Sequence, residues 1–92
     1  MYVLIFTNHM KQDLKLMRRR GKDISKLQAV LDILMNGEPL PLKYRDHQLK
    51  GRMKIFRECH IEPDWLLIYQ KDENSLILYA TATGTHADLF NL

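Results

Sequence analysis

The sequence predicts a single α+β domain in which a helical hairpin packs on an antiparallel sheet, in the order β-α-α-β-β-β with a short carboxyl-terminal tail. Two observations lead to this prediction. One strand-like run precedes two segments with helical spacing of apolar residues, and three more strand-like runs follow, joined by connections too short to hold a helix. With 92 residues, 46% of them hydrophobic, the chain has enough apolar material for one core and no room for a second. Residues 1–92 are therefore expected to form one domain.

The amino-terminal half supplies the first strand and both helices. Residues 2–7 are β-branched and aromatic-rich, as in strands, and Asn8 is placed to cap a helix that Gly21 ends. Asp23 is expected to cap the second helix, with Gly37 as its end. The apolar stripes of the two helices are Met10, Leu14 and Met17, and then Ile24, Leu27, Val30, Leu31 and Leu34. Their spacing predicts that both helices bury one face.

The carboxyl-terminal half is expected to be a β-meander of residues 53–60, 65–71 and 75–82. The second and third runs are continuously apolar, which is typical of strands covered on both faces. Since the helices cover one face only, we expect another protein chain to cover part of the other.

Composition excludes several classes of protein. The single cysteine, Cys59, rules out an intrachain disulfide and favours a reducing, cytoplasmic location. No apolar run approaches the roughly 20 residues of a membrane span, and the amino terminus has no cleavage-site pattern. We therefore expect no membrane association.

The net charge of +3 is unevenly distributed. Residues 11–22 contain six cationic side chains and one acid, Asp13, and residues 43–57 contain six more cationic side chains. Such clusters suit a polyanionic partner, either nucleic acid or an acidic protein. The alternative is that each cluster is simply the solvated face of its element.

Polar side chains that could carry chemistry lie where the predicted strands end. Strand alternation places Lys54, Phe56, Glu58 and His60 on one face, a row that is costly to bury and so resembles a functional surface. The alternative is an ordinary solvent-facing row. Asp64 follows a short turn after His60, so these two could form an acid/base pair, although Asp64 could equally cap the turn.

Metal and thiol chemistry are not expected. His47, His60, Asp64 and His86 are all ligand types, but their separations match no compact metal motif, so we predict no metal and no cofactor. Cys59 points away from His60 by strand parity, which argues against a nucleophilic role.

Aromatic residues alternate with the basic and histidine positions, as on surfaces that stack single-stranded bases. Trp65 and Tyr69 are better explained as core residues, whereas Phe90, close to His86 at the end of the chain, is expected to stack on a base.

Three segments, residues 44–51, 57–69 and 83–90, resemble the signatures of YafQ-type toxins in the RelE/ParE superfamily. The resemblance spans nearly the whole chain and implies a RelE-like fold. It implies a type II toxin, a ribosome-dependent endoribonuclease that cuts mRNA in the decoding site of the 70S ribosome by metal-free acid/base catalysis. It also implies that a cognate antitoxin of the RelB/DinJ kind neutralises the protein.

The resemblance also implies roles for individual residues. The catalytic set carried over is His47, His60, Asp64, His86 and Phe90, and the RNA-binding set is Lys50, Arg52, Lys54 and Glu58. We expect His86 to act as the acid, His60 and Asp64 to work around the nucleophile, and His47 to support the phosphate. The acid and base can be exchanged in this scheme.

Ala82 departs from the family pattern, which usually has arginine before Thr83-Gly84-Thr85-His86. Loss of a cation that stabilises a transition state costs on the order of 10²-fold in rate, so we expect weakened activity. Ala82 is open to two explanations, natural weakening or a substitution introduced so that a toxic protein could be produced. Two other functions stay open: a non-catalytic gyrase inhibitor, as in the ParE branch, and an inactive RNA-binding module.

Overall fold

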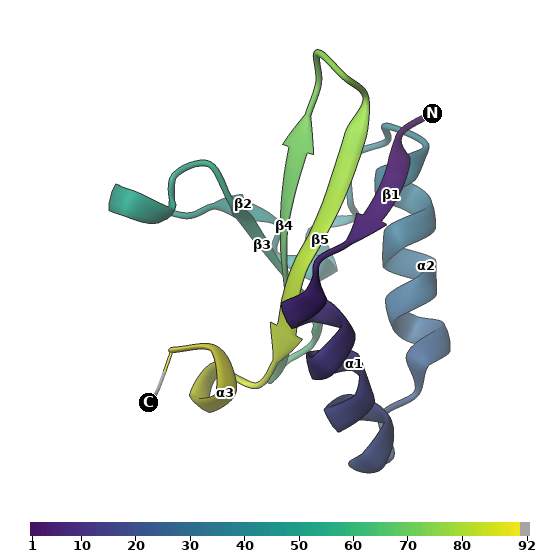
Figure 1. Cartoon of the computed structure of the whole chain (residues 1–92), viewed down its shortest axis with the longest axis vertical. Helices are drawn as coiled ribbons and strands as arrows, with labels where there is room; N and C mark the ends of the chain where they lie inside the picture. The colour runs from purple at the N-terminus through teal and green to yellow at the C-terminus, as the bar shows by residue number, and fades with distance from the viewer. Residues whose placement is uncertain (91–92) are drawn as a thin grey trace.

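Two helices pack on one face of a five-stranded mixed sheet in the computed structural model, which describes residues 1–90 (Figure 1). Strand β1 (Val3–Phe6) leads into helices α1 (Asn8–Arg19) and α2 (Ile24–Met35). The meander then follows as β3 (Arg57–Glu62), β4 (Trp65–Asp72) and β5 (Ile77–Gly84). The predicted α+β fold and its β-α-α-β-β-β order are confirmed.

The sheet contains more than the predicted meander. Its strand order is β1-β5-β4-β3-β2, and β1 runs parallel to β5 while the other neighbours are antiparallel. Parallel neighbours need a long crossover, and the helical hairpin lies within the chain that links β1 to β5. The sequence did not predict strand β2 (His47–Gln48), the two 3₁₀ turns η1 (Leu42–Tyr44) and η2 (Gly51–Met53), or helix α3 (His86–Phe90).

The helix ends follow the sequence signals with one correction. Thr7, not Asn8, caps α1, because its hydroxyl accepts a hydrogen bond from the Met10 amide at 3.1 Å. Asp23 caps α2 as predicted, accepting from the Ser25 amide at 3.0 Å. Gly21 and Gly37 follow the helices with φ of 80° and 73°, the left-handed geometry that ends helices.

Strand β3 begins four residues later than predicted. Gly51, at φ 65°, opens η2, and the Phe56 amide then donates to the Met53 carbonyl at 2.9 Å. This local turn removes Lys54 and Phe56 from the strand. Of the expected row on one face, only Glu58 and His60 belong to β3.

The core lies between the helices and the sheet and contains Trp65, Leu67 and Tyr69 of β4. The opposite face of β4 is also buried, since Leu66 and Ile68 are 0% and 4% exposed. The predicted burial of both faces is therefore confirmed for β4, while cover of the sheet by another chain stays a prediction. Helix α3 packs against β5, and Met53, Leu89 and Ile68 line one hollow.

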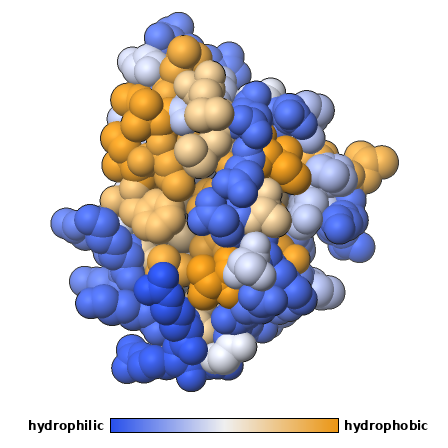
Figure 2. All heavy atoms as spheres, turned by 90° about the vertical axis from the view of Figure 1, so that its right-hand side faces the viewer, coloured by the Kyte–Doolittle hydropathy of each residue, from blue (hydrophilic) through white to orange (hydrophobic). Residues whose placement is uncertain are grey.

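The surface over β1 and α2 is divided by polarity. Figure 2 shows hydrophobic atoms gathered in the upper part of this side and hydrophilic atoms in the lower part. The exposed apolar residues include Val3 and Ile5 of the edge strand β1, and the carboxyl end of α1 carries the exposed Arg18, Arg19 and Arg20. Within residues 1–90, no helix combines the length and the apolar character needed to cross a bilayer.

Candidate active site

Four elements bring the predicted polar residues together on the sheet face opposite the helices. His47 lies on β2, directly across from Glu58 on β3, and His60 lies two residues further along β3. Asp64 lies in the turn before β4, and His86 is the first residue of α3. Residues that are up to 39 positions apart in the sequence thus share one site.

His86 pairs with Asp64. One Asp64 carboxylate oxygen, Oδ1, accepts from the His86 amide at 2.9 Å and lies 2.6 Å from His86 Nδ1. The bond from the backbone amide, and then the one from the ring, lower the pKa of Asp64. With Nδ1 bound to a carboxylate, Nε2 of His86 is the nitrogen left for chemistry.

The predicted pairing of His60 with Asp64 is therefore wrong. Strands β4 and β5 pair Leu66 with Gly84, and extending that antiparallel register by two residues places Asp64 opposite His86. The short connection between His60 and Asp64 suggested that the two lie close in space. The β4–β5 register instead places the Asp64 carboxylate beside His86.

His60 pairs instead with Glu58. His60 Nε2 lies 3.5 Å from Glu58 Oε1, and His47 Nε2 lies 3.8 Å from the same oxygen. The Glu58 side chain is only 7% exposed, compared with 16% for His60. A carboxylate this deeply buried is costly unless cationic or donor groups face it, so Glu58 and the two imidazoles form one electrostatic unit.

The two histidine–carboxylate pairs meet at their rings. The ring centroids of His60 and His86 lie 5.6 Å apart with an interplanar angle of 62°. One donor atom each from Glu58, His60 and His86 lies within 4.8 Å of the others, so these three residues could hold a metal ion. Their sequence separations gave no sign of this cluster, because two elements far apart in the chain, β3 and α3, assemble it.

An ion pair that the sequence analysis missed fixes the start of α3. The Arg20 guanidinium donates to both Asp88 oxygens, at 2.5 and 3.1 Å. Asp88 also accepts from the Thr85 amide at 2.9 Å and donates its own amide to the Thr85 hydroxyl at 3.1 Å. The Arg20 bond, then the Thr85 amide, lower the pKa of Asp88 to about 2. A Cβ at Gly84 would lie 2.8 Å from Asp88 Cβ, so this close approach requires glycine.

Asp46 does not contact the histidines but binds Arg57 and Tyr69 beside the site. It accepts from Arg57 at 3.3 and 3.1 Å and from the Tyr69 hydroxyl at 2.5 Å. Burial, followed by the bond to Asp46, raises the pKa of Tyr69. This network anchors the loop in which His47 Nδ1 lies 2.8 Å from the Arg45 carbonyl.

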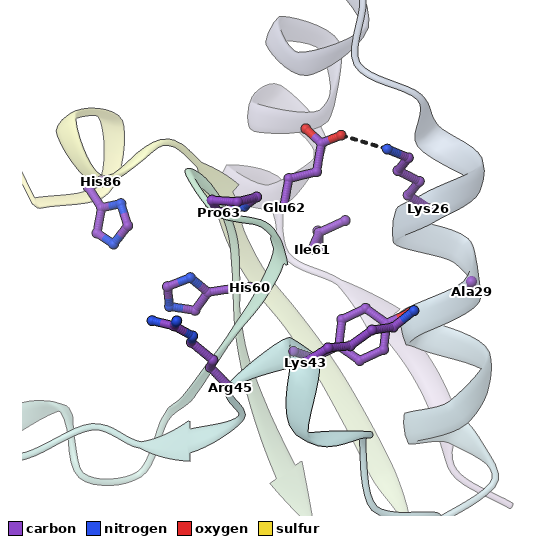
Figure 3. Close-up of a pocket in the computed structure, with 10 residues that line it drawn as sticks. Lys26, Ala29, Lys43, Arg45, His60, Ile61, Glu62, Pro63 and His86 are labelled. Carbon is purple, nitrogen blue, oxygen red and sulfur yellow. Dashed lines mark hydrogen bonds and ion pairs between the residues drawn. The ribbon is translucent and has the colours of Figure 1, made fainter.

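A cavity of about 650 Å³ opens beside His60 and His86 and extends to α2 (Figure 3). In Figure 3 the His60 ring lies between His86 and Arg45. The lining also contains Lys26, Ala29, Lys43, Tyr44, Ile61, Glu62 and Pro63. The imidazole rings of His60 and His86 thus form one end of a groove that also contains basic side chains.

The remaining predicted positions lie around this centre. Lys50, Arg52 and Lys54 are exposed on and beside η2 and do not line the large cavity. Phe90, 37% exposed, lies one helical turn after His86. Trp65 and Tyr69 are fully buried core residues, as predicted. Cys59 is also buried on the core side, and burial raises the pKa of its thiol, which agrees with its predicted lack of a nucleophilic role.

Ala82 is 7% exposed and lies opposite Ile68 in the β4–β5 pair. Ile68 in turn lies opposite Glu58, so position 82 belongs to the same cross-strand row as the buried carboxylate. A hollow of about 370 Å³ lined by Ala82, Met53, Asp88 and Leu89 adjoins it. There is room here for a larger side chain.

The same architecture occurs in solved bacterial toxins. The chain matches a chain of the Escherichia coli DinJ-YafQ complex with a TM-score of 0.90 and 38% identity. The match covers 98% of this chain and 99% of that one. A metal-bound toxin from Helicobacter pylori matches with a TM-score of 0.92, 39% identity and coverage of 98% and 100%. The fold is therefore that of this class of small toxins.

The family described as bacterial toxin of type II toxin-antitoxin system, YafQ, matches residues 2–91, and the chain belongs to it. The mRNA interferase toxin YafQ of Escherichia coli strain K12 is 42% identical over 86 residues, which cover 92% of this chain and 91% of that protein. The resemblance found in the sequence is confirmed.

Proposed function

We propose that this toxin is an mRNA interferase that cleaves RNA by metal-free acid/base catalysis. The observation that carries the proposal is the meeting of His60 and His86, each beside its own carboxylate, with ring centroids 5.6 Å apart. Two imidazoles on either side of a phosphodiester can remove one proton and supply another near neutral pH. The similarity to the mRNA interferase toxin YafQ of Escherichia coli supports RNA cleavage as the reaction.

In the proposed reaction the ribose 2′-oxygen attacks the phosphorus while the bond to the 5′-oxygen breaks. His60 takes the 2′-proton, and His86 gives a proton to the leaving 5′-oxygen, so a 2′,3′-cyclic phosphate and a 5′-hydroxyl are formed. The Asp64 carboxylate holds the His86 ring through Nδ1 and so sets its orientation toward the leaving group. Asp64 thus serves the acid and not the nucleophile. His47, 51% exposed, supports the phosphate, and Phe90 stacks beside the cut.

A metal ion is not part of this proposal. An ion held by Glu58, His60 and His86 would occupy ring nitrogens through which His60 takes a proton and His86 gives one. The same residues can therefore bind a metal or act as acid and base, but not both at once.

The cation that the family pattern provides to stabilise the phosphorane is missing from position 82, which is alanine in this chain. Removal of such a group lowers the rate by on the order of 10²-fold. Arg45, which lies beside His60 in Figure 3, is our candidate for the remaining positive charge. Its backbone has φ of 50°, an unfavourable conformation for a residue with a Cβ, at a cost of about 1–2 kcal/mol.

We further propose that cleavage occurs in the decoding site of the ribosome and that a DinJ-like antitoxin blocks it. The exposed cations Lys50, Arg52 and Lys54 are expected to contact the RNA backbone. The antitoxin proposal rests on the family and on the solved complex of the Escherichia coli YafQ with DinJ.

The decisive experiment maps RNA ends after translating ribosomes are incubated with this chain, with its Ala82→Arg form and with Ala82→Arg/His86→Ala. We expect cuts within the decoding-site codon, faster with Ala82→Arg and nearly absent without His86, with a cyclic phosphate at the new 3′ end. If neither of the first two proteins cuts, the proposal is wrong. Inhibition of gyrase supercoiling with intact mRNA would favour the ParE-like alternative instead.

A further inference from the structure

We infer that the groove between α2 and β3 is a binding subsite for a nucleotide of single-stranded RNA that flanks the scissile phosphate. This inference rests on the proposed function, because it assigns the groove to the same substrate. The groove begins at His60 and His86 and continues without a break to Lys26 and Ala29 on α2. A phosphodiester placed between the two imidazoles must extend its chain in some direction, and this opening leads away from the reacting atoms.

The lining matches the chemistry of a nucleotide. Ala29, Ile61 and Pro63 give an apolar surface, and Tyr44 contributes an aromatic ring on which a base can stack. Base stacking on an aromatic side chain contributes about 1–3 kcal/mol. The cavity of about 650 Å³ is of the size that holds small ligands.

The charges of the groove suit phosphate. Its lining holds three cationic side chains, Lys26, Lys43 and Arg45, and one carboxylate, Glu62. That carboxylate is already paired with Lys22 at 3.1 Å and with Lys26 at 2.8 Å (Figure 3). The pairing leaves Lys43 and Arg45 to face an anion, with Lys43 Nζ 5.0 Å from the centroid of the Tyr44 ring. An aromatic ring beside cations is what a base with its attached phosphate requires.

The test measures binding to the free protein, so it does not depend on cleavage. The probe is a single-stranded RNA pentamer with 2′-O-methyl groups, which lacks the nucleophile, and the readout is its Kd together with the backbone amides that shift in NMR titrations. We expect shifts at Tyr44, Ile61 and Glu62. Ala29→Trp, which fills the groove from an exposed helical position, should weaken binding at least tenfold.

Gln28→Trp is the matched control, because it adds the same side chain one residue earlier on α2, where Gln28 bonds to Asp32 outside the groove. This variant should bind within twofold of the parent. Lys43→Ala should weaken binding several-fold and make it less sensitive to salt. Circular dichroism establishes that all three variants are folded.

Equal binding by folded Ala29→Trp and Gln28→Trp would overturn the inference, as would an absence of groove shifts at millimolar probe. Binding of an antitoxin peptide in the groove that RNA does not compete with would also overturn the inference. The ribosome assay separates the two proposals. If the groove binds the pentamer but no protein cuts mRNA, the proposed function fails and the subsite stands. If cleavage occurs and Ala29→Trp cuts like Gln28→Trp, the subsite fails alone.

Discussion

The two histidine–carboxylate pairs of this toxin differ in depth. The outer pair, His86 with Asp64, has side chains that are 41% and 65% exposed, and its shortest contact is 2.6 Å. The inner pair, His60 with Glu58, is 16% and 7% exposed and its contact is 3.5 Å. The outer pair is a close hydrogen bond at the mouth of the site, whereas the inner pair is a buried charge shared with His47.

The difference indicates how one sheet face can divide acid and base work. In the outer pair a carboxylate holds one ring nitrogen of His86 and leaves the other outside that bond, which suits the delivery of a proton to a leaving group. In the inner pair the carboxylate is desolvated and faces two imidazoles, so its charge acts on both.

Removing the outer imidazole should have the largest effect. We expect His86→Ala, made in the Ala82→Arg form, to lower the cleavage rate by about 10²–10⁴-fold, the usual contribution of an acid or base. His86 is partly exposed, so the melting temperature should change little. Single-turnover cleavage on ribosomes and thermal unfolding measure the two effects. A loss below threefold would remove His86 from the chemistry.

Restoring the missing cation should raise the rate by on the order of 10²-fold. Position 82 shares a cross-strand row with Glu58, and the hollow beside it accommodates the longer side chain of Ala82→Arg. Guanidinium chloride at low millimolar concentration should partly rescue the Ala82 chain and leave the arginine form unchanged. Equal rates for Ala82→Arg and its parent would show that residue 82 does not act on the transition state.

Weakening the outer carboxylate should have a smaller effect. Asp64→Asn keeps the shape but removes the charge that holds the His86 ring, and we expect a loss of about tenfold. Asp72→Asn is the control, because Asp72 also accepts amide bonds in a turn but lies at the end of β4 far along the strand from Asp64. If the two variants cleave equally, Asp64 is only a turn residue, the alternative that the sequence left open.

The smallest expected effect concerns the ion pair that holds α3. Arg20→Ala should lower cleavage by no more than about fivefold, since exposed ion pairs contribute little, while Arg19→Ala should have no effect because Arg19 is the exposed neighbour. The pKa of Asp88 is depressed from 3.8 to about 2, so its contribution to stability is full above about pH 4 and is lost as the pH falls toward 2. Amide chemical shifts of residues 85–89 measured across this range should follow that loss in the parent and not in Asp88→Asn.

The helices and meander strands were predictable because their signals are local. The stripe of Leu27, Val30, Leu31 and Leu34 fixes α2 and its buried face without reference to the rest of the chain. The start of β3 was mispredicted because residues 53–56 are strand-like in composition, while Gly51 at positive φ commits the preceding backbone to a turn. Burial of Leu66 and Ile68 was predicted from their continuous apolar run, whereas α3, which packs against β5, is too short to be recognised by periodicity.

The sequence by itself determined the α+β class, the family and the set of polar residues at the strand ends, since these depend on local periodicity and on motifs in order along the chain. Only the tertiary structure decided how those residues pair. The β4–β5 register pairs Asp64 with His86. Strand alternation already placed Glu58 and His60 on one face, but the burial of Glu58 came from the tertiary structure. Local sequence patterns likewise do not predict the ion pair between Arg20 and Asp88, which lie 68 residues apart. The physical reason is that hydrogen bonds and ion pairs act over a few ångströms in space, and strand register sets those distances independently of separation along the chain.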